Sequence, residues 1–258
     1  MYWTEAINSG LLNQNGYEIL VFQQAIVPIG EYPNKETYQP TFYELLARLK
    51  TPYGVLNAGK WIDSIATDND LMHRLDVYML KAAARLHQTT GHRYTVNIGN
   101  ATLRQPYIFQ TISQDICYGY CPVNAIALEI SERDEVQDFE QKILAGLKHN
   151  HTIYLDDIGA KRTNHASLSY VTEDWVGGIK LDRDFINKLS GNTRRRSNGL
   201  IGSLFAFCAG AHLFCICEGV EDDLVWENLL ILRSAFADGW MGLFVQGWGV
   251  GLEERVEL

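Results

Sequence analysis

The chain has a deficit of positive charge. Its 258 residues include 22 Lys and Arg against 31 Asp and Glu, which gives a formal net charge of -9. A protein that follows a nucleic-acid backbone needs a basic surface, so this deficit argues against a nucleic-acid polymer as partner. A phosphate ligand stays open, because bound metal ions can carry the positive charge between an acidic site and a phosphate.

The chain also lacks a zinc or disulfide pattern and a secretion signal. Its N-terminal residues MYWTEAINSG contain no basic stretch followed by an apolar one, so no signal peptide is predicted. The cysteines are odd in number and match no zinc spacing, so we expect buried, reduced thiols and a cytoplasmic location. These cysteines are Cys117, Cys121, Cys208, Cys215 and Cys217.

Long apolar runs are scarce. Only residues 200–217, LIGSLFAFCAGAHLFCIC, approach the length of a bilayer span, and they include His212 and are followed at once by Glu218. A buried helix that runs straight into a buried strand produces the same pattern. We therefore expect no membrane segment. We also find no low-complexity stretch, charged tail or internal repeat, which favours a single globular domain.

Short apolar runs alternate with helical stretches along the chain. Expected strands lie at 17–27, 93–99, 125–131, 152–158, 178–182, 213–217 and 242–246, with another apolar run at 42–48, and expected helices at 71–86, 106–116, 134–147, 200–209 and 224–236. Continuous apolar strands between helices are typical of parallel strands buried on both faces. Seven or eight such units in about 250 residues predict an α/β protein with a TIM-like (β/α)8 barrel.

Polar side chains lie at or near the ends of almost all these strands, where a barrel places its active site. Any one of them could cap a helix or face water. Together, however, crowded carboxylates repel one another, and their burial implies bound cations. The residues are Glu44, Asn97, Glu129, Asp156, Asp157, Lys180, Asp182, Glu218 and Gln246.

The candidate ligands identify the class of cation. Glu44, Asn97, Glu129, Asp156 and Asp157 offer only oxygen, without His or Cys, and hard oxygen ligands suit Mg²⁺ or Mn²⁺ rather than zinc. Several carboxylates can hold two such ions about 4 Å apart, an arrangement used to cleave phosphoesters. Lys180 would add a positive charge for a phosphate oxygen or an attacking hydroxide.

Seven short strings, in order between residues 17 and 248, resemble the motifs of the EAL domain family. The chain is therefore expected to be a single EAL domain over residues 1–258, with its core at about 17–248. The resemblance implies an EAL-type barrel and leaves the first strand open to an antiparallel direction. The strings are ELLAR (44–48), VNIG (96–99), LEISE (128–132), LDDIG (155–159), SLSYV with IKLDRDFI (167–171 and 179–186), EGVE (218–221) and QGW (246–248).

The resemblance implies hydrolysis of cyclic di-GMP to linear pGpG with two divalent cations, Mg²⁺ or Mn²⁺. It assigns metal binding to Glu44, Asn97, Glu129, Asp156 and Asp157. The hydrolytic water would be positioned by Lys180, and Glu218 would act as a metal-site carboxylate and candidate general base. The resemblance assigns substrate contacts to Gln24, Arg48 and Gln246. It assigns support of the site and its loop to Glu132, Asp182 and Glu221.

The chain departs from the family pattern in several places, among them Ala25 where the family has proline and Ala58-Gly59 where it has an Ala-Glu pair. After Gly159 the loop reads AKRTNHA, three residues longer than usual, and after Gln246-Gly247-Trp248 the usual Arg-Pro is replaced by GVGLEE. Some EAL domains bind cyclic di-GMP without cleaving it, or bind only proteins, so a receptor or protein-binding module is the alternative function. About sixteen residues precede the first strand, so we expect no fused sensor. A homodimer and a possible regulatory protein partner are expected instead.

Overall fold

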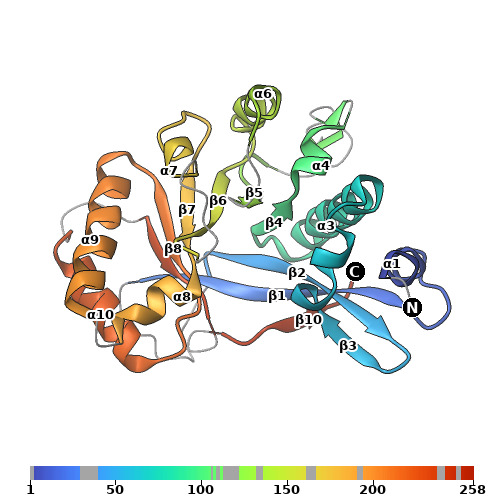
Figure 1. Ribbon diagram of the computed structural model, residues 1–258, viewed down its shortest axis with the longest axis horizontal. Coiled ribbons are helices and arrows are strands. Elements are labelled where there is room, and N and C mark those ends of the chain that lie inside the picture. The colour runs from blue at the N-terminus through green and yellow to red at the C-terminus, as the bar shows by residue number, and fades with distance from the viewer. Residues whose placement is uncertain are drawn as a thin grey trace.

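The computed structural model describes residues 3–29, 40–105, 107–108, 111–112, 122–131, 136–160, 167–190, 194–236, 242–247 and 251–258. A closed barrel forms the centre of the fold (Figure 1). Its strands are β1 (Glu18–Pro28), β2 (Phe42–Thr51), β4 (Tyr94–Ile98), β5 (Ile126–Ser131), β6 (Ile153–Ile158), β7 (Gly178–Leu181), β8 (Phe214–Cys217) and β9 (Leu243–Val245).

The direction of the strands confirms the expected barrel and settles its first strand. From β2 through β9 each barrel strand runs parallel to the next. β1 closes the ring and is antiparallel to both of its barrel neighbours, β2 and β9. The fold is thus a TIM-like barrel with one reversed strand. The carboxyl ends of all the other strands open at one mouth.

A small antiparallel extension projects beyond this mouth. β2 pairs with β4 only at Tyr43 and Glu44, yet it pairs with β1 as far as Lys50. β3 (Gly54–Asn57) continues from β2 as a hairpin, and β10 (Glu254–Val256) pairs with the first half of β1. Neither β3 nor β10 was expected from the sequence, because both are short and mostly exposed and lack the apolar run that marks the equally short buried strands β7 and β9.

Helices surround the barrel, as the alternation along the chain predicts (Figure 1). The longest, α3, caps its start with the Asp68 side chain, which accepts from Leu71 N, and ends at Gly91, whose φ of 72° suits glycine. Most of the expected helix 106–116 lies outside the described residues. The helical elements are α1 (Trp3–Leu11), η1 (Ala58–Lys60), α2 (Ile62–Ile65), α3 (Asn69–Thr90), α4 (Asn100–Leu103), α6 (Asp138–Leu147), α7 (Ser167–Tyr170), α8 (Arg183–Ile186), η3 (Asn187–Leu189), α9 (Arg194–Gly210) and α10 (Asp223–Ser234).

The apolar run at 200–217 has the structure that its sequence suggested. It comprises most of α9 and, after a short turn, β8. Cys208, Cys215 and Cys217 are buried there as free thiols, as expected, whereas Cys117 and Cys121 fall outside the described residues. Within the described part of the chain, we find no helix with both the length and the apolar character needed to cross a bilayer.

Candidate active site

Two layers of side chains fill the barrel. The site is the layer nearer the mouth, and the other layer is called the lower one. The lower layer is an apolar plug, and two residues further along most strands a polar side chain faces the same interior, because strand side chains alternate with a period of two. On the reversed β1 the polar residue precedes its apolar one. The apolar and polar members of each strand are Ile26 with Gln24, Phe42 with Glu44, Ala127 with Glu129, Tyr154 with Asp156, Ile216 with Glu218 and Phe244 with Gln246.

The remaining interior positions follow the same spacing. Thr95 precedes Asn97 on β4, and Gly178 precedes Lys180 on β7. A Cβ at Gly178 would lie 2.6 Å from a ring carbon of Tyr154, so only glycine fits beside the plug. The plug closes the lower end of the barrel, and the polar layer faces the mouth.

Lys180 is the hub of the polar layer. Its side chain is 1% exposed, and its Nζ lies 2.6 Å from Glu218 Oε1, 2.9 Å from Glu129 Oε2, 3.2 Å from Glu44 Oε2 and 3.4 Å from Asp156 Oδ1. These carboxylates come from four different strands or strand ends. One ammonium therefore binds together four acidic groups that would otherwise repel one another.

Two amides hold the carboxylates in orientation. Asn97 Nδ2 donates to Glu44 Oε1 at 3.0 Å and to Glu129 Oε2 at 3.2 Å. Gln246 Nε2 donates to Glu44 Oε2 at 2.6 Å and to Gln24 Oε1 at 3.0 Å. Charge-assisted bonds of this kind fix the rotamers of the carboxylates before any ligand arrives.

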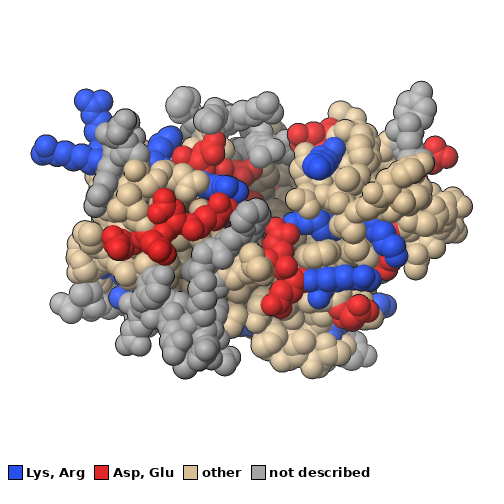
Figure 2. Space-filling model, turned by 90° about the horizontal axis from the view of Figure 1, so that it is seen from below, with Lys and Arg blue, Asp and Glu red and all other residues tan. Residues whose placement is uncertain are grey.

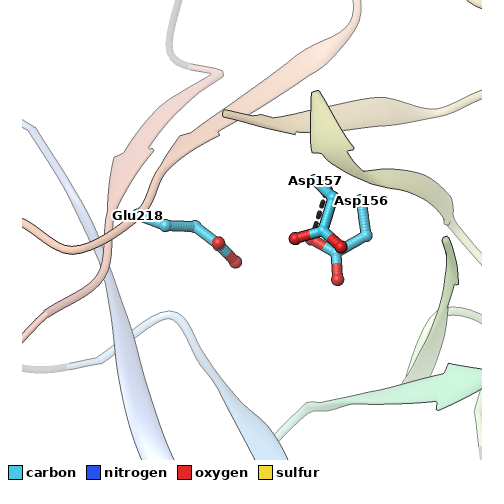
Figure 3. Close-up of side chains that lie close together, drawn as sticks. All are labelled: Asp156, Asp157 and Glu218. Carbon is cyan, nitrogen blue, oxygen red and sulfur yellow. Dashed lines mark hydrogen bonds between the residues drawn. The ribbon is translucent and has the colours of Figure 1, made fainter. Parts of the chain in front are cut away.

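Asp156 and Asp157 both face the mouth although they are consecutive, which a regular strand does not allow. The pairing of β6 with β7 shifts register between Leu155 and Ile158, and Asp157 adopts φ 61°. This bulge turns the second carboxylate back toward the first. One carboxylate oxygen each from Asp156, Asp157 and Glu218 lies within 4.8 Å of the others, and Glu218 points at the aspartate pair across the interior (Figure 3).

Burial and mutual repulsion govern the ionisation of the cluster. Burial raises the pKa of Glu218 to about 8 against the opposing charge of Lys180, and burial likewise raises the pKa of Glu129 and Asp156. Burial also opposes ionisation of Glu44, yet Lys180 and the bonds from Gln246 and Asn97 lower its pKa. For Lys180, burial is outweighed by the surrounding carboxylates, which hold its pKa well above the usual range.

The donor set fits hard divalent cations. Two buried oxygens, Glu129 Oε1 and Gln246 Oε1, accept no hydrogen bond from the described residues. Such unsatisfied oxygens are costly unless a ligand meets them, and a positive ion in the cluster would also offset the carboxylate repulsion. The residues able to hold it are the predicted ligands Glu44, Asn97, Glu129, Asp156 and Asp157, together with Glu218.

Three other predicted site residues, Arg48, Asp182 and Glu221, have different polar partners. Arg48 lies on the part of β2 beyond the barrel and donates to Glu253. Asp182 caps α8 by accepting from Asp184 N and Phe185 N, and Glu221 pairs with Arg183 at 3.0 Å. Glu132 lies outside the described residues. Asp182 and Glu221 thus contact neighbouring segments, and their role in supporting the site and its loop stays a prediction.

Reasoning from the sequence missed Glu253. Its only signal was the departure of residues 249–254 from the family pattern, which says nothing about which side chain they would contact.

The charge on the surface agrees with the deficit of basic residues in the composition. On the face shown in Figure 2, acidic and basic side chains are interspersed, without one broad basic area among the described residues.

A comparison with family models decides the classification. The EAL domain model matches residues 18–244 of this chain. The chain belongs to the EAL domain family. The match covers all barrel strands except the last residue of β9, and it includes every residue of the polar layer described above except Gln246.

Similar proteins agree with this assignment at low identity. The signaling protein YkoW of Bacillus subtilis is 26% identical over 72% of this chain and 25% of its own length. The cyclic di-GMP phosphodiesterase PdeA of Borreliella burgdorferi is 24% identical over 81% of this chain and 32% of its own. The EAL domain thus spans about a quarter to a third of these relatives.

A solved structure shows the same fold. The crystal structure of an EAL domain protein from Listeria monocytogenes EGD-e superposes with a TM-score of 0.77 and 21% identity. The superposition covers 98% of this chain and 92% of the other. Likeness at this identity establishes the barrel, and the chemistry has to be argued from the residues of the site.

Proposed function

We propose that this EAL domain hydrolyses cyclic di-GMP to linear pGpG with the help of two divalent cations, Mg²⁺ or Mn²⁺. One observation carries the proposal: four carboxylates and an adjacent aspartate converge at the barrel mouth around the single buried ammonium of Lys180. Such a concentration of oxygen ligands suits hard cations and a phosphate between them. The family and the activity named for relatives such as PdeA support cyclic di-GMP as the substrate.

The residues divide into three roles. Glu44, Asn97, Glu129, Asp156 and Asp157 would hold the cations, which when bound polarise the phosphate and acidify a water. Lys180 positions the hydrolytic water and stabilises negative charge that grows at the phosphorus. Glu218, 2.6 Å from Lys180 and facing the aspartate pair, would accept the proton of that water, because cations bound beside it would keep its carboxyl ionised.

Substrate contacts extend from the cluster along β1 and β2. Gln246 and Gln24 are hydrogen-bonded at the mouth, and Arg48 lies four residues beyond Glu44 on β2. A guanidinium at that position can bind a phosphate oxygen or a guanine edge. Substrate would thus lie between the metal cluster and the antiparallel extension. The family resemblance supports the wider proposals of a homodimer and a separate regulatory protein, and the buried free thiols support the proposal of a cytoplasmic location.

The test is direct. Purified protein is incubated with cyclic di-GMP and Mg²⁺ or Mn²⁺, and pGpG is followed by chromatography beside an EDTA control. We expect pGpG only when the metal is present, and at least a 100-fold loss of rate in Glu218→Gln. Tight binding without product would establish the receptor alternative, and the absence of both binding and product would reject cyclic di-GMP as the ligand.

A further inference from the structure

The C-terminal residues 251–256 lie along the side of the proposed substrate face. β10 extends the sheet on the edge of β1 opposite β2, with Val256 beside Val21, Arg255 beside Phe22 and Glu254 beside Gln23. Figure 1 shows β10 running alongside β1. This segment lies beyond residue 244, where the match to the EAL model ends.

Glu253 forms a hydrogen-bonded ion pair with the guanidinium of Arg48. Arg48 Nη2 donates to Glu253 Oε2 at 2.5 Å, and Nη1 donates to the carbonyl oxygen of Ala47 at 2.8 Å. The guanidinium carbon also lies 5.8 Å from the ring centre of Phe22. The Arg48 side chain is only 7% exposed, whereas that of Glu253 is 29% exposed. Glu253 is thus the partner nearer to water and the one able to move away.

The same segment contacts the second predicted substrate residue on this face. Gln24 Nε2 donates to the carbonyl oxygen of Gly251 at 3.4 Å, while Gln24 Oε1 accepts from Gln246. Residues 251 and 253 therefore contact both Gln24 and Arg48. A ligand that used these two side chains would have to exchange those contacts for its own.

We propose that Glu253 is a built-in competitor for the substrate phosphate at Arg48. A carboxylate and a phosphate both accept from the paired N–H groups of a guanidinium, so Arg48 cannot bind the two in the same geometry. Glu253 must therefore leave Arg48 before substrate binds in full, and any factor that draws residues 251–256 away from β1 raises the affinity of the site. This inference rests on the proposed function and adds the regulation of the same site.

The size of the effect follows from the population of free Arg48. Apparent affinity falls in proportion to the fraction of molecules in which the binding residue is available. A partly exposed ion pair of this kind keeps the arginine occupied most of the time but not permanently. Removing the charge of Glu253 is therefore expected to tighten cyclic di-GMP binding about fivefold.

The experiment measures binding without turnover. Glu253→Gln is placed in a Glu218→Gln background, and the Kd for cyclic di-GMP is measured by calorimetry with Mg²⁺ present. Glu254→Gln is the matched control, because it removes the same charge one residue later, from the opposite side of the segment, where the side chain is exposed. We expect about fivefold tighter binding in Glu253→Gln and no change in Glu254→Gln.

A second background separates competition from positioning. With Arg48→Ala also present, Glu253→Gln should no longer alter the Kd, since the competitor has lost its target. Unchanged or weaker binding in Glu253→Gln, with Arg48 intact, would overturn the inference, the weaker case meaning that Glu253 holds Arg48 in place for the ligand. If the parent protein with Glu253 intact shows no binding at all, the proposed ligand is rejected and the inference falls with it.

Discussion

Lys180 Nζ lies 2.6 Å from Glu218 Oε1 inside the barrel, and the lysine side chain is 1% exposed. The same ammonium also faces Glu44, Glu129 and Asp156, so one positive charge is shared by four acids. Burial of that many like charges is costly unless further cations or protons join them. The negative charge of this site is thus balanced only when cations or protons bind to it. The stability of the fold should therefore depend on these bound cations or protons.

Lys180→Met tests this dependence. Methionine keeps most of the volume and removes the ammonium, leaving two buried carboxylates, Glu44 and Glu129, and two partly buried ones without their shared partner. We expect the free energy of unfolding, measured by urea denaturation in EDTA at pH 7.5, to fall by about 3–5 kcal/mol. Mg²⁺ or Mn²⁺ should recover part of that loss. An unchanged free energy in EDTA would show that the carboxylates are neutral without Lys180.

Asp156→Asn tests the metal site without reference to turnover. A cation that binds only the folded state at 100 times its Kd adds about 2.7 kcal/mol to stability. Wild-type protein should therefore melt at a higher temperature with Mn²⁺ than with EDTA, and Asp156→Asn should lose most of this difference. Asp63→Asn, which neutralises an exposed aspartate of α2, serves as the control and should keep the full shift. Equal shifts in both variants would place the cation elsewhere.

Two substitutions at Asp157 should distinguish the contribution of backbone strain to stability from the contribution of the carboxylate to hydrolysis. Its φ of 61° is a left-handed conformation that asparagine tolerates, whereas a side chain such as alanine pays about 1 kcal/mol or more for it. In EDTA, we expect Asp157→Ala to be less stable than Asp157→Asn by about 1 kcal/mol in chemical denaturation. Both variants should lose hydrolysis. If the two unfold at the same denaturant concentration, the bulge relaxes when the carboxylate is removed.

Asp76 on α3 predicts a pH effect on stability outside the cluster. Its Oδ2 accepts from Gly99 N at 2.9 Å and from Thr102 Oγ1 at 2.6 Å, which ties α3 to the start of α4. Burial raises the pKa of Asp76 to about 7, although these two bonds oppose the rise. The folded state therefore holds a proton that the unfolded chain has already lost above its ordinary pKa near 4.

The sign follows from proton linkage. Between about pH 4 and pH 7 the folded state binds more protons than the unfolded state, so the contribution of Asp76 to stability decreases as pH rises, by at most about 4 kcal/mol. Asp76→Asn keeps an oxygen that can accept both bonds and cannot ionise. Relative to wild type, this variant should gain stability from pH 5 to pH 8 in parallel urea titrations. A constant difference across that range would contradict the assignment.

Most strands and helices of the fold could be predicted from the sequence, because barrel strands and helices produce periodic or continuous runs of apolar residues. Apolar runs at 93–99, 125–131 and 213–217 became β4, β5 and β8 within a residue at each end. The expected helix 134–147 begins later, at Asp138, because Gln137 is extended at the N-cap with ψ 165°. The short strands β3 and β10 are mostly exposed and left no apolar run to detect, and the place of β10 in the sheet depends on β1, which is distant in the chain.

The sequence by itself determined the polar layer, because the period of two puts Glu44, Glu129 and Lys180 on the inner face of their strands two residues beyond the apolar plug. It also determined the EAL resemblance. Only the tertiary structure decided that Asp157 joins Asp156 at the mouth, since strand alternation would send it outward without the bulge. Only the tertiary structure showed that Arg48 pairs with Glu253, which is 205 residues away in sequence. Such a contact forms only when distant parts of the chain fold together, so it leaves no local sequence pattern.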